Sequence, residues 1–191
     1  MHETALPPAP VYAALDAEAL FCAHARFVAS FLRHLGTPVA DLDDLTQEVF
    51  VVAHRRGGYV PGAASPRTWL SAIAFRIAKA SQRRRSRRRP EEADLEQLRD
   101  EASDLGQALD ARRSLHRVEA ALDRLSLDMR AAFVLFEIEG ESCESIAATL
   151  EVPVGTVYSR LHHARRSFMK AYHRESGRTA GRTLAVRGGE R

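Results

Sequence analysis

The stretch ESCESIAATLEVPVGTVYSRLHHARR, residues 141–166, decides the fold of the second half of this chain. Ile146, Ala147 and Leu150 fall on one face of a short helix, and Ala147 is small enough for a second helix to cross close to it. That second helix carries a buried stripe at spacings of four, three and four. The stripe consists of Val157, Leu161, Ala164 and Phe168. Two helices joined by a tight turn are typical of a helix-turn-helix, whose second helix enters the DNA major groove.

Capping residues and glycines predict the helices on either side of this motif. Ser142 is an N-cap for its first helix, Ser126 caps a helix that runs to about Ile138, and Gly140 breaks that helix. Another helix runs from Ser114 to Leu125. Residues 114–173 therefore predict one helical domain, and the Gly- and Arg-rich residues 174–191 predict a disordered tail.

The first half predicts a second helical domain, residues 11–89. Its helices run over 11–35, from Asp41 to about residue 56, and from Pro66 into an arginine run. Asp41 is read as an N-cap, Gly57 and Gly58 as a stop, and Ser65 as the cap before a first-turn proline. The buried stripes are Leu20, Phe27, Phe31 and Leu35, then Leu42, Leu45, Val49 and Val52, then Leu70, Ile73, Ala74 and Ile77.

Composition favours an all-α chain with two small helical domains. The chain has 191 residues, 45% hydrophobic and only 7% aromatic, and it is rich in Ala, Leu and Arg, which are good helix formers. Residues 90–113 are acidic and poor in large apolar side chains, so we expect a flexible linker there.

The charge distribution indicates the class of partner, and the cysteines indicate the compartment. The formal net charge is +3 and the pI about 9.2, but residues 76–89 and the chain from Arg160 onward are strongly basic, which fits a polyanion touched at two places. Two distant cysteines, with no CxxC, indicate a reduced, cytoplasmic chain. We find no signal peptide and no run of apolar residues long enough to insert into a membrane.

Three segments together resemble one protein family. DLDDLTQEVFVVAHR (41–55) is similar to conserved region 2.2, SPRTWLSAIAFRIAKASQRRR (65–85) to regions 2.3 and 2.4, and residues 121–168 to region 4, of bacterial RNA polymerase sigma factors. The chain resembles the extracytoplasmic function (ECF) type of the sigma-70 family. The resemblance implies a factor that binds core RNA polymerase and directs promoter recognition and transcription initiation. It reads the −35 element as duplex and the −10 element as a melted strand.

The helix from Asp41 carries the predicted polymerase contact. Asp44, Gln47 and Glu48 lie at i, i+3 and i+4 and so share one face. The residues alone favour a solvated face. The resemblance reverses that reading, because the matching family residues dock on a coiled coil of the polymerase's largest catalytic subunit. Leu45 and Phe50 complete the predicted contact.

The next segment carries the predicted −10 contact. The resemblance implies that the loop 59–69 captures a flipped base of the non-template strand, at a cost in unstacking that contacts must offset. Trp69 is read either as a base-stacking residue or as a tryptophan at the edge of the core. Arg76, Lys79 and Arg83 lie on one helical stripe and are predicted to contact phosphates, which adds salt-sensitive affinity and little sequence information.

The second helix of the helix-turn-helix carries the predicted −35 contact. Arginine suits bidentate recognition of guanine and contact with phosphate. An ordinary amphipathic helix is the alternative. His162 and His163 lack a cysteine or carboxylate at metal spacing, so neither metal nor cofactor is predicted. The predicted −35 residues are Thr156, Ser159, Arg160, His163 and Arg165.

Several positions depart from the family pattern. The usual Arg-Asn pair is replaced by Phe75-Arg76, the usual Asp by Ala80 and an apolar residue by Gln82, and these changes bear on which −10 sequence is read. In the helix-turn-helix, Glu151 stands where glycine is usual and Tyr158 where lysine is frequent. If Glu151 is left-handed, it costs roughly 1 kcal/mol relative to glycine.

Partners and rival functions follow from the same residues. No nucleophile–base set, phosphate-binding loop or metal set is visible, so we expect no enzyme. The implied partners are core RNA polymerase, promoter DNA and an anti-sigma protein. One rival is a helix-turn-helix regulator that binds duplex DNA without polymerase, and it gives no account of residues 41–85. Another is an adaptor that binds polymerase or an anti-sigma protein without initiating transcription.

Overall fold

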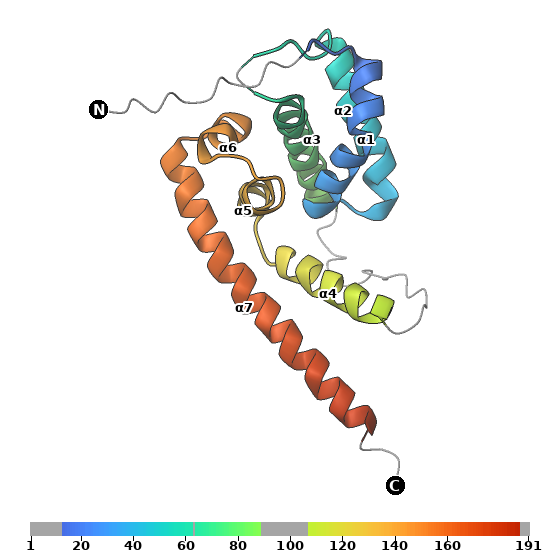
Figure 1. Ribbon diagram of the computed structural model, residues 1–191, viewed down its shortest axis with the longest axis vertical. Helices are drawn as coiled ribbons and strands as arrows, with labels where there is room; N and C mark the ends of the chain where they lie inside the picture. Colours follow the sequence, from blue (N-terminus) through green and yellow to red (C-terminus); the bar gives the residue numbers. More distant parts are fainter. Residues whose placement is uncertain (1–12, 63, 89–106, 188–191) are drawn as a thin grey trace, which may run out of the picture.

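A computed structural model of the chain describes residues 13–62, 64–88 and 107–187, with side chains from Ser114 to Arg174 in the last of these ranges. The described chain consists of helices joined by turns and loops, with one isolated antiparallel bridge between Leu15 and Tyr59. Its helices form two groups that lie side by side (Figure 1). Among these residues no helix is both long enough and apolar enough to cross a membrane.

The first group, here the N-terminal domain, is a bundle of α1 (Ala17–His34), α2 (Val39–Arg55) and α3 (Pro66–Arg88). The predicted inward stripe of α3 is confirmed, since Leu70, Ile73, Ala74 and Ile77 are all buried. Burial of such side chains is the main stabilising term, at about 1.5–3 kcal/mol for each large one. The other fully buried large side chains of this core are Leu20, Val28, Phe31, Leu32 and Val49.

Two predicted helix starts in this domain are wrong. Residues 13–16, which fall inside the predicted helix 11–35, are not helical. The first helix begins at Ala17, where Asp16 caps it by accepting a 2.8 Å hydrogen bond from the Ala19 amide; residues 11 and 12 lie outside the described residues. The second helix begins at Val39, after Pro38. Asp41 therefore lies in the first turn instead of capping it, and its carboxylate accepts a 3.0 Å hydrogen bond from Arg85.

The second group, here the C-terminal domain, contains α4 (Gln107–Leu122), α5 (Leu127–Phe133), the π-helix η1 (Val134–Ile138), α6 (Cys143–Leu150) and α7 (Val154–Arg187). The predicted helix-turn-helix is confirmed as α6 and α7. Ile146, Val157 and Ala164 are fully buried, and Ser142 caps α6 by accepting a 3.1 Å hydrogen bond from the Ser145 amide.

Helix ends at both edges of this domain differ from the predictions. α4 begins at Gln107, inside the predicted linker, and the rest of that linker lies outside the described residues. α7 continues to Arg187, so the tail predicted to be disordered from residue 174 is helical to that point. The segment contains no proline, and its alanines, arginines and leucine favour a helix, while Gly177 and Gly181 weaken a helix without ending it.

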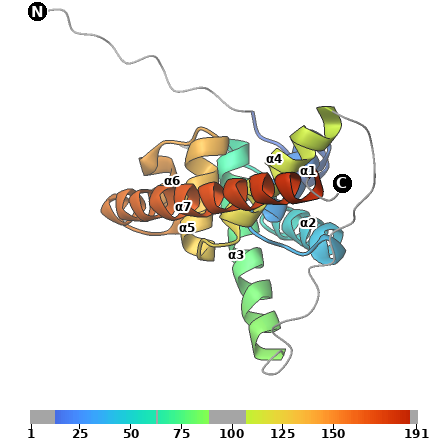
Figure 2. The ribbon, with the colours of Figure 1, turned by 90° about the horizontal axis from the view of Figure 1, so that it is seen from below.

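The two domains pack against each other through α3. α3 contacts α6 of the C-terminal domain, and the buried apolar side chains of both domains form one continuous cluster. Seen from below, the second half of α3 extends away from the rest of the molecule (Figure 2). The first half of α3 is therefore the part that lies between the domains.

The turn of the helix-turn-helix has the strained geometry that its sequence predicts. Glu151 ends α6 with φ 55° and ψ 49°, in the left-handed region. It is the non-glycine residue with positive φ in the described chain. A side chain costs about 1–2 kcal/mol in this conformation.

We expect Glu151→Gly to be more stable than Glu151→Ala by about 1 kcal/mol in the free energy of unfolding. Both variants lose the same carboxylate, so the difference isolates the backbone. Urea unfolding followed by circular dichroism measures it. Equal stability of the two variants would contradict a strained turn.

Candidate nucleic-acid and polymerase interface

The predicted polymerase contact forms an exposed polar ridge on α2. Asp44, Gln47 and Glu48 are all exposed. Leu45 and Phe50 are only 7% and 6% exposed, so they support the ridge from within the core. Two exposed apolar side chains lie beside them. Val51 of α2 is 46% exposed, and Phe21 of α1 is 47% exposed and packs edge-on against Phe50 with ring centroids 5.0 Å apart. The sequence patterns did not single out Phe21, because it lies outside the predicted core stripe.

Trp69 is fixed at the edge of the N-terminal core. Its ring packs edge-on against Tyr59, with centroids 6.0 Å apart. Tyr59 is itself anchored: its hydroxyl donates a 2.7 Å hydrogen bond to the carbonyl of Ala64, and its backbone pairs with Leu15. Trp69 is half-buried in this arrangement, which leaves base stacking by its open side a prediction.

Two of the three predicted −10 cations on α3 contact carboxylates of the C-terminal domain. Arg76 is hydrogen-bonded to Glu151. The Lys79 ammonium lies 2.7 Å from an oxygen of Asp128 and 5.3 Å from the centre of the Phe75 ring. Arg83, in the outer part of α3, is exposed.

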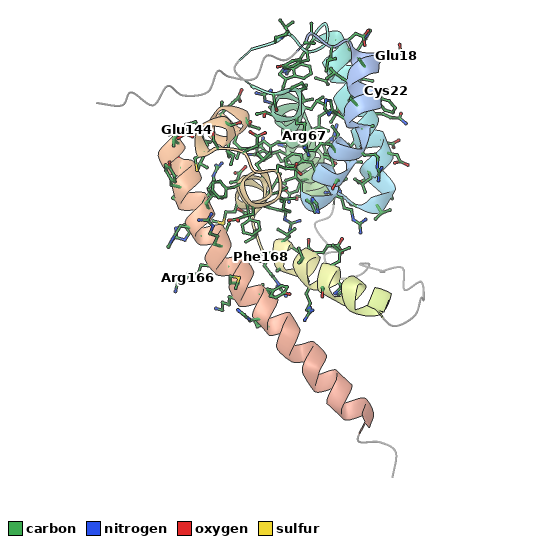
Figure 3. All side chains as sticks on the ribbon, viewed as in Figure 1. Glu18, Cys22, Arg67, Glu144, Arg166 and Phe168 are labelled. Atoms are coloured by element: carbon green, nitrogen blue, oxygen red, sulfur yellow. The ribbon has the colours of Figure 1, made fainter. Side chains whose placement is uncertain are left out.

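The start of α3 makes the same kind of contact. Arg67 pairs with Glu139 at 2.6 Å, and the Thr68 hydroxyl donates a 2.6 Å hydrogen bond to Glu141. Burial raises the pKa of Glu139, and the charge of Arg67 acts in the opposite direction. Figure 3 places Arg67 between the two domains. Arg67 and Thr68 therefore both donate hydrogen bonds to carboxylates that lie more than seventy positions later in the chain.

A buried arginine of the C-terminal domain contacts the N-terminal domain just after α1. Arg130 of α5 is 8% exposed at its side chain and pairs with Asp123 at 3.1 Å. Burial lowers its pKa, and the Asp123 charge opposes that shift. The guanidinium lies against Gly36 at the end of α1, where φ is +85° and an added Cβ would overlap it. Gly36 thus provides both the left-handed turn and the space for a side chain of the other domain.

The predicted −35 residues are spread along the first turns of α7. Ser159 and His163 are exposed, and Thr156 is half-buried. Arg160 is 20% exposed at its side chain and lies 3.7 Å from Asp128, within the same domain. Arg165 is half exposed and donates from Nε to Glu137 at 2.6 Å, with its guanidinium 5.0 Å from the centre of the Phe136 ring.

A hollow of about 490 Å³ lies between α7, η1 and the start of α6. Tyr158 lines this hollow and is 56% exposed. Lysine is frequent at this position in the family that the sequence resembles. The charges of Cys143 and Glu144 are the main causes that raise the Tyr158 pKa. The lining is mostly apolar, with cations among it: Phe136, Cys143, Tyr158, Leu161, His162, Arg165, Arg166 and Met169. No group of three metal-ligating side chains occurs among the residues described.

Comparisons with protein families match both domains. The family described as "Sigma-70 region 2" matches residues 20–88, and "Sigma-70, region 4" matches residues 115–168. The two matches cover the helices α1 to α3 and the helix-turn-helix with the helices before it.

Curated relatives match over most of the chain. The "ECF RNA polymerase sigma factor SigE" of Mycolicibacterium smegmatis is 38% identical over 143 residues, which cover 73% of this chain and 55% of that protein. The "RNA polymerase sigma-H factor" of Pseudomonas aeruginosa is 35% identical, over 69% of this chain and 72% of its own length. The "ECF RNA polymerase sigma-E factor" of Escherichia coli is 33% identical, over 68% and 73%.

Solved structures share the fold. The sigma factor RpoE of Bartonella quintana, in complex with the anti-sigma factor NepR, has a TM-score of 0.65 at 24% identity, over 79% of this chain and 92% of that chain. CnrH, in complex with the cytosolic domain of CnrY, has a TM-score of 0.55 at 26% identity, over 81% and 85%.

Proposed function

This chain belongs to the sigma-70 family as a sigma factor of the ECF type, and we propose that it binds core RNA polymerase through α2 and places it at promoters by two separate DNA contacts. A sigma factor acts in transcription initiation by binding other molecules, so its function depends on its binding surfaces. The observation that supports the proposal best is that the residues predicted to contact polymerase and DNA lie on the two domains that match sigma regions 2 and 4.

The polymerase contact is assigned to the ridge of Asp44, Gln47 and Glu48. All three side chains are exposed on one face of α2 while its opposite face holds the core. An acidic and amide surface of this kind complements a partner helix rich in arginine, and such charge complementarity raises the rate and the specificity of docking. The exposed Phe21 beside the ridge adds an apolar contact that the charged residues lack.

The DNA contacts are assigned to α3 and α7. On α7, Ser159, His163 and Arg165 are exposed along the helix that would enter the major groove of the −35 element. On α3, the cations Arg76, Lys79 and Arg83 would hold phosphates of the −10 strand, with Trp69 at the edge of the loop that captures a base.

An anti-sigma protein is a further proposed partner, and the cytoplasm is the proposed compartment. RpoE of Bartonella quintana, which shares the fold, was solved with an anti-sigma factor bound. The hollow on the C-terminal domain is lined mostly by apolar side chains, with Arg165 and Arg166 among them, and this is the chemistry that an amphipathic, acidic helix would require.

The test is transcription from a defined promoter by purified chain and core polymerase. Genomic DNA of the source organism serves as template, and transcript ends are mapped by sequencing. We expect starts that depend on the chain and share two elements upstream. Duplex binding without any polymerase-dependent start would instead favour a helix-turn-helix regulator. Polymerase binding with no start on any template would favour an adaptor.

A further inference from the structure

α7 continues well past the part of the chain that matches the sigma-70 family. The region 4 match ends at residue 168, and α7 runs on to Arg187. The helix is strongly basic, since it contains eight lysines and arginines and one acidic residue, Glu175. The proposed DNA contacts on α7 use only residues before 168, so they leave the charge of the later turns without a function.

Three cations spaced about one turn apart lie on the outer face of α7. With about 100° per residue, Arg166, Lys170 and Arg174 lie about 140°, 180° and 220° around the helix from Leu161, which is buried. All three side chains are exposed, and Figure 3 shows Arg166 on the outer side of the domain. These three residues are called the distal cationic face below.

The cations of this face differ from the other arginines of α7 in having no acidic partner. Arg160 and Arg165, which lie nearer the core, are each paired with a carboxylate. Among the side chains that the structure describes, none forms a salt bridge with a cation of the distal cationic face. An unpaired cation can bind a phosphate without first giving up a carboxylate. The face is therefore suited to an anionic partner outside the chain.

α4 and α5 hold this part of α7 in place from its inner side. Phe168 stacks on Phe133 and on Tyr172, with ring centroids 4.9 Å and 6.0 Å apart. The Arg117 guanidinium of α4 lies 5.6 Å from the centre of the Tyr172 ring. α4 packs against the middle of α7 (Figure 1). The backbone that carries the distal cationic face is therefore ordered before any ligand binds.

The distal cationic face continues the face of α7 that carries predicted −35 contacts. Ser159 and His163 lie about 160° and 200° around the helix from Leu161, on the same outer side. The major groove is about 12 Å wide, a distance that about eight helical residues span at 1.5 Å each. A helix that crosses the groove with Ser159 and His163 at the base edges leaves it before Lys170. Lys170 and Arg174 then meet the phosphates that flank the groove.

We propose that Arg166, Lys170 and Arg174 bind phosphates of duplex DNA at the edge of the groove that contains the −35 element. This inference rests on the proposed assignment of α7 to the −35 contact. Cations that neutralise phosphates release counterions from DNA, so they add affinity that falls with salt and does not depend on sequence. α7 then acts in two parts: its first turns read bases, and its later turns hold the helix on the DNA backbone.

The experiment compares two charge-matched triple variants of the full chain. The distal variant replaces the whole distal cationic face, with Arg166→Gln, Lys170→Gln and Arg174→Gln. The control variant replaces three exposed cations that lie outside α3 and α7, the two helices assigned to DNA, with Arg26→Gln, Arg56→Gln and Arg124→Gln. Circular dichroism checks that both variants keep the helical content of the natural chain.

The measured quantity is the affinity for duplex DNA in the absence of polymerase, at several salt concentrations. Fluorescence anisotropy is used with a duplex that contains the mapped −35 element and with a scrambled duplex of equal length. Each phosphate contact adds about 0.9 to the slope of log affinity against log salt. We expect the distal variant to lose about 2.7 from that slope. Between 50 and 200 mM salt, the affinity of the natural chain should then fall by about 40-fold more than that of the distal variant.

The loss in the distal variant should be the same on both duplexes, because phosphates carry no sequence information. The control variant should keep the slope of the natural chain. An unchanged slope in the distal variant overturns the proposal, since its cations are then only solvated. An equal reduction in the control overturns it as well, because the effect is then one of net charge. A loss confined to the −35 duplex makes these residues base readers and rejects the phosphate contact.

The scrambled duplex keeps this test separate from the transcription test. If it shows the expected slopes and no transcript starts on any template, the phosphate contact stands and the proposed function fails. If transcripts start at a defined promoter and the distal variant keeps the natural slope, the proposed function stands and the phosphate contact is rejected.

Discussion

Reversing two charges on α2, with Asp44→Arg and Glu48→Arg together, should abolish binding to core RNA polymerase and leave the helical content unchanged. Both side chains are exposed and lie one turn apart, so the core beneath them is not disturbed. Placing two cations against an arginine-rich partner replaces attraction by repulsion, which costs several kcal/mol. An affinity loss of at least about 100-fold follows from a cost of about 3 kcal/mol.

The matched control reverses two exposed acids that lie off α2, with Glu18→Arg on α1 and Glu144→Arg on α6. Asp43 is unsuitable because it lies one turn before Gln47 and so flanks the ridge. Pull-down and fluorescence titration with core polymerase measure both variants, and circular dichroism checks the fold. Loss of binding in the control as well would mean that overall charge, and not this ridge, governs docking. Retained binding in the Asp44 and Glu48 variant would move the docking surface elsewhere.

Local signals in the sequence predicted the parts of the fold that local hydrogen bonds decide. Ser65, Ser126 and Ser142 each accept a hydrogen bond from an amide three residues on, and a serine before an apolar run predicts that bond directly. Asp41 carries the same signal and still does not cap. The chain there turns at Pro38, three residues before the predicted cap and one before the observed helix, so a stronger conformational constraint decides the start.

The candidate site could be predicted only as separate faces. Helical spacing gave the ridge on α2 and the cation stripe on α3, because both lie within a few turns of one helix. It gave no hint that Lys79 meets Asp128 or that Arg76 meets Glu151, which are 49 and 75 positions apart. Such pairs depend on how two domains pack. The partial burial of Arg160 against Asp128 depends on how α5 and α7 pack within the C-terminal domain, and it leaves Arg165 as the more accessible arginine of the predicted −35 set.

Loss of the Arg165 side chain, in Arg165→Ala, should weaken binding to the −35 duplex by about 1–3 kcal/mol, or roughly 5- to 150-fold. The guanidinium is half exposed on α7 and is held by Glu137 and the Phe136 ring, so it is preorganised, and DNA competes with these two contacts for it. Arg124→Ala removes an exposed guanidinium of the same domain that lies outside α7, and serves as the matched control. Affinities are measured at one salt concentration for a duplex with the mapped −35 element and for a scrambled duplex of equal length. A base-reading Arg165 loses affinity on the −35 duplex and little on the scrambled one. Equal losses on both would make it a phosphate contact, since phosphates carry no sequence information.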